Sequence, residues 1–319
     1  MDAAVVPAYG RAPELREWAE PGAPPGHTLI RNLAAALNPV DLKMASGTYY
    51  YGAPEPPYVA GAEGVGRVLQ SATFPEGTRV WYERGPLGGA FAQVTAVDDD
   101  RLVEIPHGLD DSVASTLGVA GLAAWDALSR RAQLRPGETV LVLGASGAVG
   151  QFAVQIAKVL GATRVVAAAR NTAVIGPAAR AAADEVAGLD SADLGILVSR
   201  LRAAAPQGYD VILDPVWGRA AQAALACAAD GARLVQIGSS GNETLTLPAG
   251  LVRKSTTSIL GYTIYSIPWA DKRAAYRRLA EHVSAGRLKV ELETLPLAHV
   301  AEAWARQSGS PGVKLVLEP

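Results

Sequence analysis

The sequence predicts an α/β fold in which a doubly wound parallel sheet is inserted into a β-rich domain. Three observations predict this class. Short β-rich segments fill the first third of the chain, strand and helix patterns alternate in the middle, and mixed structure returns at the end. Alternating strands and helices are typical of a parallel sheet covered by helices on both faces. A chain of 319 residues is also long enough to form two cores.

The composition narrows the class of protein. There are 29 Lys and Arg residues against 31 Asp and Glu residues, a net charge of −2. This balance argues against a nucleic-acid or anionic-membrane partner. The one cysteine, Cys227, cannot form an internal disulfide, and it excludes a Cys-rich metal site. The N-terminus lacks the apolar stretch of a signal peptide, and no apolar run of about 18 residues appears. We therefore expect a cytoplasmic protein without a membrane span.

The first third of the chain reads as strands separated by turns. Glycine and proline punctuate these strands, and residues 46–64 contain too many of both for a helix, so we expect a long ordered loop there. The expected strands lie in residues 27–37, 64–69, 78–83 and 89–97.

The middle of the chain changes character. Residues 111–132 have a helical pattern, and residues 138–171 read as a strand, a glycine turn, an amphipathic helix and a second strand. Further strands are expected in 184–189, 209–216, 232–240 and 257–264, and a helix in 220–229.

The tail returns to mixed structure and suggests where the domains divide. Helices are expected over 271–286 and 297–309, followed by a strand over 313–319. We predict an α/β domain over residues 116–262, and a β-rich domain over residues 1–115 and 263–319.

The strongest motif is a glycine turn between a strand and a helix. Gly144, Gly147 and Gly150 follow the apolar strand 140–143, and a helix is expected to begin near residue 148. Glycine lets the backbone approach a pyrophosphate, and a helix N-terminus offers unpaired N–H groups. A tight turn in any α/β protein is the alternative. We predict a Rossmann-type cofactor site that includes Ser146, Gly147, Ala148 and Val149.

The end of the second strand distinguishes between the two nicotinamide cofactors. An NAD site usually places Asp or Glu there, to accept a hydrogen bond from the ribose 2′-OH. This strand ends in Arg170 and Asn171 instead. A guanidinium pairs well with a 2′-phosphate, so we infer NADPH as the cofactor. The alternative is that Arg170 is an ordinary surface charge.

Two later strand ends should line the same crevice, because ligands lie beyond the carboxyl ends of parallel strands. The first is Asp214-Pro215, and the second is Ile237-Gly238-Ser239. Small residues at these ends leave room for ribose and nicotinamide. Plain turns are an equal alternative.

Taken together, these motifs resemble the medium-chain dehydrogenase/reductase superfamily, and within it the zinc-free quinone oxidoreductase and enoyl reductase branch. The resemblance extends over nearly the whole chain and implies a GroES-like catalytic domain. It is carried by the segments Asn38-Pro39-Val40-Asp41, Ser46-Gly47-Thr48-Tyr49, Gly61-Ala62-Glu63-Gly64-Val65-Gly66, Gly121-Leu122-Ala123-Ala124-Trp125, Leu134-Arg135-Pro136-Gly137-Glu138 and Gly312-Val313-Lys314-Leu315-Val316, together with the glycine turn.

The sequence departs from the zinc enzymes of this superfamily. Those enzymes hold a catalytic metal with Cys, a His–Glu pair and a further Cys or Asp. Here Asn38 stands where the first Cys would lie, and Ala62 stands where the His would lie. Zinc needs about four such ligands, so we expect no metal. Ala123 also replaces a threonine common in relatives, which removes a hydroxyl that helps fix the cofactor.

The resemblance implies a reaction that proceeds without a metal. NADPH would deliver hydride to an enone, a quinone or an enoyl thioester, and hydrogen-bond donors would stabilise the charge on the carbonyl oxygen. Tyr49 matches the Gly-x-Tyr of the branch, and a phenol, with a pKa of about 10, can donate at neutral pH. Asn38 is a second catalytic candidate, as a partner of the substrate or the nicotinamide ribose. Tyr262 and Lys314 complete the expected cofactor site.

Two other functions stay open at this point. One is an enoyl-thioester reductase of fatty-acid or polyketide metabolism, and the other is an NADPH-binding protein without turnover. Packing is the alternative for Tyr49, a turn residue before Pro39 is the alternative for Asn38, and Glu63 is expected to be structural. Relatives pair through an edge strand, and residues 257–264 have β-branched positions suited to one, so we expect a homodimer.

Overall fold

The computed structural model describes residues 1–85 and 87–319, and its contacts divide the chain into two compact units. The domain boundaries expected from the sequence, at 115/116 and 262/263, stay predictions, because a compact unit is not the same as a domain. Unit 1 comprises Met1–Val119, Trp269–Ser284 and Glu291–Pro319, and unit 2 comprises Ala120–Pro268 and Ala285–Val290.

Unit 1 is built on two β-sheets. In its described residues, the larger sheet has the order β15-β16-β3-β5-β6-β8, with β7 also paired to β3, and the smaller has the order β2-β1-β4. The strands are β1 (Asp2–Val6), β2 (Glu14–Glu17), β3 (His27–Ala36), β4 (Tyr58–Val59), β5 (Glu63–Gln70), β6 (Arg79–Glu83), β7 (Val94–Asp98), β8 (Leu102–Glu104), β15 (Leu292–Pro296) and β16 (Lys314–Glu318).

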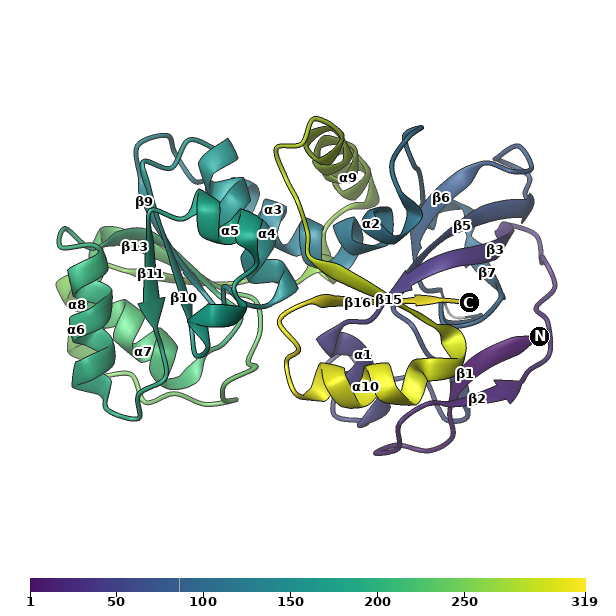
Figure 1. Cartoon of the computed structure of the whole chain (residues 1–319), viewed down its shortest axis with the longest axis horizontal. Helices are drawn as coiled ribbons and strands as arrows, with labels where there is room; N and C mark the ends of the chain where they lie inside the picture. The colour runs from purple at the N-terminus through teal and green to yellow at the C-terminus, as the bar shows by residue number, and fades with distance from the viewer. Residues whose placement is uncertain (86) are drawn as a thin grey trace. The chain divides into compact units, whose positions relative to one another are not determined.

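Strand β3 illustrates why these segments form a sheet with one buried face. Thr28, Ile30, Asn32 and Ala34 alternate along it and are buried. The core of unit 1 gathers around Ile30, Leu37, Tyr82, Phe91, Leu315 and Leu317. Its helices are α1 (Pro39–Ala45), α2 (Asp111–Thr116), α9 (Trp269–Ser284) and α10 (Val300–Ser308), with 3₁₀ turns at Asp99–Arg101 and Leu297–His299, and α10 packs beside α1 (Figure 1).

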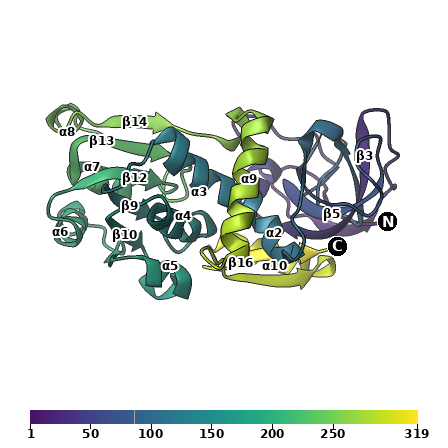
Figure 2. The ribbon, with the colours of Figure 1, turned by 90° about the horizontal axis from the view of Figure 1, so that it is seen from above.

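Unit 2 contains a parallel sheet with the order β11-β10-β9-β12-β13-β14, which confirms the predicted fold class. Figure 2 shows β14, β13, β12, β9 and β10 in this sequence across the sheet. The direction of winding reverses between β9 and β12, where doubly wound sheets bind ligands. The strands are β9 (Thr139–Leu143), β10 (Arg164–Ala169), β11 (Glu185–Gly188), β12 (Tyr209–Asp214), β13 (Ala228–Gln236) and β14 (Ser258–Gly261).

The helices of unit 2 follow the strands in alternation. They are α3 (Ala123–Asp126), α4 (Ala148–Val159), α5 (Pro177–Ala182), α6 (Leu194–Ala204), α7 (Gly218–Ala226) and α8 (Ala249–Lys254), with 3₁₀ turns at Thr172–Val174 and Ile264–Ser266. The predicted helix 111–132 is helical from residue 111 to residue 131, and it includes π-helical segments at Leu117–Leu122 and Ala127–Arg131.

Several elements escaped the sequence analysis. Strand β2 is exposed along its whole length, so it lacks the alternation of apolar and polar residues by which a strand is recognised. The other missed strand, β1, is short and lies next to the N-terminus. Helix α6 begins at the cap residue Asp193, whose carboxylate accepts from the N–H of Ile196 at 3.0 Å. That cap is a signal which could have been recognised. Within the described part of the chain, no helix combines the length and apolar character needed to cross a membrane.

Candidate active site

Unit 2 brings most of the predicted cofactor residues to one edge of its sheet. Residues 146–149 follow the carboxyl end of β9, and Arg170 and Asn171 follow that of β10. Asp214 ends β12, residues 237–239 follow β13, and Tyr262 follows β14. These strands are consecutive in the sheet, so the residues form an unbroken row across the point where the winding reverses.

The three glycines of the turn have different surroundings. Gly144 adopts φ +63°, a conformation that favours glycine, and a Cβ there would lie 2.9 Å from Val216. A Cβ on Gly150 would lie 2.3 Å from the carbonyl oxygen of Gly144, so this glycine lets helix and turn approach each other. At Gly147 a Cβ would meet only that same oxygen, at 3.5 Å. Gly147, the N-cap of α4, therefore leaves free space in front of the helix N-terminus.

The end of β10 places a positive charge beside this turn. Arg170 is exposed directly after the strand. The Oδ1 atom of Asn171 accepts from the N–H of Ala173 at 3.0 Å and caps a short 3₁₀ turn. The Asn171 side chain is thus partly used within the protein, whereas the guanidinium of Arg170 extends from an exposed position.

Asp214 fixes the turn that follows β12. Its Oδ1 accepts from the N–H groups of Val216 at 2.8 Å and Trp217 at 2.7 Å. This carboxylate holds a turn in which Trp217 has φ +61°, a conformation that side-chain-bearing residues rarely adopt. Its buried Oδ2 has no hydrogen-bond partner among the described residues. Burial raises the pKa of Asp214 to about 6, although the N–H groups of Trp217 and Val216 lower it.

The two remaining strand ends are also held by local hydrogen bonds. The amide of Gln236 donates from Nε2 to the carbonyl of Gly238 at 2.9 Å. The carbonyl of Pro215 accepts from both the backbone N–H and the hydroxyl of Ser240, each at 3.1 Å. The Tyr262 hydroxyl donates to the carbonyl of Leu122 at 3.4 Å. Backbone from β12 and β13 therefore forms a connected edge beside the glycine turn.

Unit 1 contains a buried chain of polar side chains around Asn38, which we call the Lys314–Asn38–Glu63 chain. The Lys314 ammonium donates to Asn38 Oδ1 at 2.5 Å and to the carbonyl of Leu37 at 2.9 Å. Asn38 Nδ2 donates to Glu63 Oε1 at 2.8 Å and to the carbonyl of Ala36 at 3.0 Å. All three residues are buried: the exposed fractions of Lys314, Asn38 and Glu63 are 4%, 1% and 0%.

The other carboxylate oxygen of Glu63 reaches into a helix. Glu63 Oε2 accepts from the N–H of Val119 at 2.7 Å and from Trp81 Nε1 at 3.0 Å. A Cβ on Gly118 would lie 2.0 Å from Oε2, so only glycine admits the carboxylate there. Capture of the Val119 N–H by a side chain accounts for the π-helical segment Leu117–Leu122, because that N–H leaves the regular helical pattern.

Burial opposes ionisation throughout this cluster. It raises the pKa of Glu63 to about 7 and that of Asp41 to about 6, while the Lys314 ammonium lowers both. Burial also lowers the pKa of Lys314, and the two carboxylates raise it. Because both oxygens of Glu63 accept from N–H donors, the hydrogen bonds favour its ionised form.

Tyr49 lies in the loop that follows α1. Its half-buried ring is 4.7 Å from the ring of Tyr50 and 6.0 Å from that of Tyr51, measured between centroids. Tyr50 and Tyr51 are 75% and 58% exposed. Tyr49 is therefore the most enclosed of the three adjacent tyrosines.

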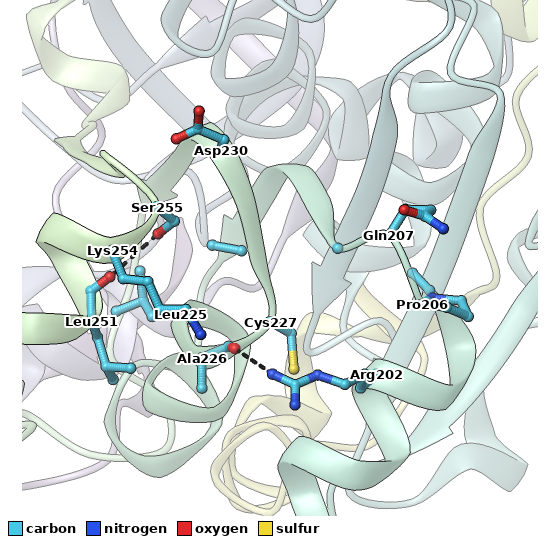
Figure 3. Close-up of a pocket in the computed structure, with 13 residues that line it drawn as sticks. Arg202, Pro206, Gln207, Leu225, Ala226, Cys227, Asp230, Leu251, Lys254 and Ser255 are labelled. Atoms are coloured by element: carbon cyan, nitrogen blue, oxygen red, sulfur yellow. Dashed lines mark hydrogen bonds between the residues drawn. The ribbon is translucent and has the colours of Figure 1, made fainter.

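A separate cavity of about 230 Å³ lies at the opposite edge of the unit 2 sheet (Figure 3). The segments 205–208 and 225–228, which precede β12 and lead into β13, form part of its wall. In it, Arg202 donates to the carbonyl of Ala226 at 3.0 Å, at the C-terminal end of α7. A cation is favourable at a helix C-terminus, so this arginine has a structural explanation. The predicted cofactor residues do not line the cavity.

Comparison with known proteins places this geometry in a family. Residues 24–107 match the model of the alcohol dehydrogenase GroES-like domain, and residues 148–283 match that of the zinc-binding dehydrogenases. Prostaglandin reductase-3 from Bos taurus is 32% identical over 290 residues, which span 84% of this chain and 72% of that protein. The chain belongs to the medium-chain dehydrogenase/reductase superfamily. This membership confirms the resemblance predicted from the motifs.

Other similar proteins in this medium-chain dehydrogenase/reductase superfamily are named as quinone oxidoreductases. That from Pseudomonas aeruginosa is 39% identical over 163 residues, and the match spans 48% of this chain and 48% of that relative, about half of each. The solved structure of a quinone oxidoreductase from Pseudomonas syringae pv. Tomato DC3000 has a TM-score of 0.87 and 25% identity over 100% of both chains.

The side chains of this medium-chain dehydrogenase/reductase do not fit the zinc implied by one family description. Zinc takes thiolate, imidazole and carboxylate ligands. Here the amide of Asn38 lies between Glu63 and the ammonium of Lys314, and both oxygens of Glu63 already accept from N–H groups. Among residues 1–85 and 87–319, no group of three His, Cys, Asp or Glu side chains has the arrangement of a metal site.

Proposed function

We propose that this medium-chain dehydrogenase/reductase is an NADPH-dependent oxidoreductase that reduces quinones or the activated C=C bond of an α,β-unsaturated carbonyl, without zinc. The observation that carries the proposal is the row of strand ends in unit 2, with open space at Gly147. The names of the similar proteins, two quinone oxidoreductases and a prostaglandin reductase, support a reductase.

The row of strand ends fits a dinucleotide. The N–H groups of Ala148 and Val149, in the first turn of α4, suit a pyrophosphate, because the first N–H groups of a helix have no acceptor within it. Ser146 and Gly147 allow close approach. Arg170 would pair with the 2′-phosphate. The rest of the proposed cofactor site is Asn171, Asp214, Pro215, Ile237, Gly238, Ser239 and Tyr262.

The sequence also predicts Lys314 at the cofactor, and that stays a prediction. Its ammonium has two acceptors within unit 1, Asn38 Oδ1 and the carbonyl of Leu37. An ammonium carries three N–H donors, so these contacts occupy two of them.

Bound NADPH would supply the hydride for the reduction. Charge then develops on the substrate's carbonyl or quinone oxygen, and a hydrogen-bond donor placed there lowers the barrier. We assign this donation to the phenol of Tyr49. Toward a substrate or the nicotinamide ribose, Asn38 would serve only as an acceptor, because both hydrogens of its amide are donated to Ala36 and Glu63. We also propose a homodimer, with β14 at the exposed edge of its sheet as the pairing strand.

The test is to measure NADPH binding and NADPH oxidation with a benzoquinone, a simple enone and a crotonyl thioester. We expect NADPH binding, with oxidation in the presence of the quinone or the enone. Turnover with the thioester alone would favour an enoyl-thioester reductase. Binding without turnover on any of the three would favour an NADPH-binding protein, and failure to bind NADPH would overturn the proposal.

A further inference from the structure

The inference concerns how the amide of Asn38 is held in the Lys314–Asn38–Glu63 chain. The ammonium of Lys314 donates to its oxygen at 2.5 Å, and its nitrogen donates to Glu63 at 2.8 Å. Rotating the amide by half a turn would place its NH₂ group against the ammonium and its oxygen against the carboxylate. Both contacts would be repulsive in a buried site. The opposite charges on either side therefore select one orientation of Asn38.

Asn38 in turn defines where helix α1 begins. It is the N-cap residue of Pro39–Ala45, and its backbone N–H donates to Asp41 Oδ2 at 2.8 Å. Asp41 lies in the first turn of the helix and is 3% exposed. The side chain of Asn38 is thus attached to Lys314 and Glu63, while its backbone is attached to α1.

Tyr49 follows the end of this helix after a short connection. Helix α1 ends at Ala45, whose carbonyl accepts from the N–H of Gly10 at 2.8 Å. Gly47 then adopts φ +73°, and a Cβ there would lie 2.9 Å from the ring of Tyr9. The turn between α1 and Tyr49 has therefore little freedom of its own, so a displacement at the beginning of α1 would be transmitted to Tyr49.

We propose that Lys314 and Glu63 are positioning residues for the reduction, because together they fix Asn38 and, through helix α1, the loop that carries Tyr49. This inference rests on the proposed function, in which Tyr49 donates to the substrate oxygen. It gives Lys314 a different task from binding the cofactor. The two tasks predict different measurements, since the strand ends proposed to bind NADPH belong to unit 2 and the Lys314–Asn38–Glu63 chain belongs to unit 1.

The experiment compares Lys314→Met with the wild type by kcat and by the Kd for NADPH. We expect kcat to fall at least tenfold, with the Kd for NADPH unchanged within twofold. A tenfold or greater rise in this Kd with kcat retained would overturn the proposal and favour a cofactor contact. In a Tyr49→Phe background, Lys314→Met should lower kcat by no more than a further twofold. Full additivity of the two losses would also overturn it.

Lys272→Met is the matched control for removing a buried lysine. Lys272 is 2% exposed, and its ammonium donates to both oxygens of Glu83 at 2.8 Å. This pair lies in the same unit but does not belong to the Lys314–Asn38–Glu63 chain. We expect kcat of this variant to stay within twofold of wild type once corrected for the folded fraction. Should Lys314→Met fail to fold, Glu63→Gln is the second variant, and the same loss of kcat at constant Kd is expected.

A final readout separates this inference from the proposed function. Hydrogen exchange of the peptide spanning residues 39–52 should be at least tenfold faster in Lys314→Met than in wild type, and not in Lys272→Met. This measurement needs no turnover. If the wild type reduces none of the substrates yet the exchange difference appears, the proposed function fails, while the positioning of the Tyr49 loop by Lys314 is supported. Equal exchange in the two variants would overturn this positioning role.

Discussion

The sharpest test of the cofactor site contrasts alanine at two glycines of the same turn. A Cβ at Gly147 would meet only the carbonyl oxygen of Gly144, at 3.5 Å, which is ordinary van der Waals contact. Gly147 also has φ −82° and ψ 161°, which any residue can adopt. At Gly150, a Cβ would lie 2.3 Å from that same oxygen and 2.6 Å from Ala145 Cα, both backbone atoms.

These distances predict opposite outcomes for the two variants. Gly147→Ala should reduce the free energy of unfolding by less than about 1 kcal/mol, the cost of a poorer N-cap. Its added methyl group would, however, occupy the space proposed for the pyrophosphate. We expect NADPH to bind at least tenfold more weakly, a loss of about 1.4 kcal/mol. Gly150→Ala should reduce the free energy of unfolding by about 1–3 kcal/mol, because the turn and helix must move apart.

The assay combines urea denaturation with titration of NADPH against protein fluorescence. The two variants share the same chemical change and the same turn, so each serves as a control for the other. The reasoning would be refuted if Gly147→Ala folded normally and bound NADPH as tightly as the wild type. The pyrophosphate would then lie elsewhere. A Gly150→Ala variant as stable as the wild type would contradict the close packing at this turn.

Three further predictions concern other parts of the site. Arg170→Ala should weaken NADPH at least tenfold and NADH by less than twofold in direct titrations, and equal losses would remove the proposed 2′-phosphate contact. Tyr49→Phe should lower kcat at least tenfold while leaving the Kd for NADPH unchanged, since it removes only the donor; Tyr50→Phe, with its exposed ring, is the control and should have wild-type kcat. Burial raises the pKa of Glu63 from 4.5 to about 7, so the folded protein binds the proton of this carboxyl group more tightly than the unfolded protein does. This proton binding contributes about 3 kcal/mol to the free energy of unfolding at low pH, and the contribution is lost as the pH rises from about 4.5 to 7. The free energy of unfolding of Glu63→Gln should therefore fall less steeply with pH over this interval, and identical slopes in the two proteins would contradict the assignment.

The parallel sheet of unit 2 could be predicted because the local sequence of each strand indicates whether it is buried. Strands such as β9 and β12 are buried runs of apolar residues, and glycines and cap residues mark their ends. Once parallel strands are recognised, their carboxyl ends must share one edge, which places residues as distant in sequence as Gly147 and Tyr262 in one row. Strand β2 could not be found in this way, because all its residues are exposed and its identity depends on pairing with β1.

The environment of Asn38 could not be predicted, because it depends on long-range contacts. By local sequence alone, Asn38 is an ordinary turn residue before Pro39, Glu63 is a residue near a strand, and Lys314 is a charge near the C-terminus. Their hydrogen bonds join positions 25 and 276 residues apart in the chain. A buried ammonium and a buried carboxylate are each costly alone, so each needs the other, with Asn38 between them. The Lys314–Asn38–Glu63 chain is therefore recognisable only after β3, β5 and β16 have come together in one sheet.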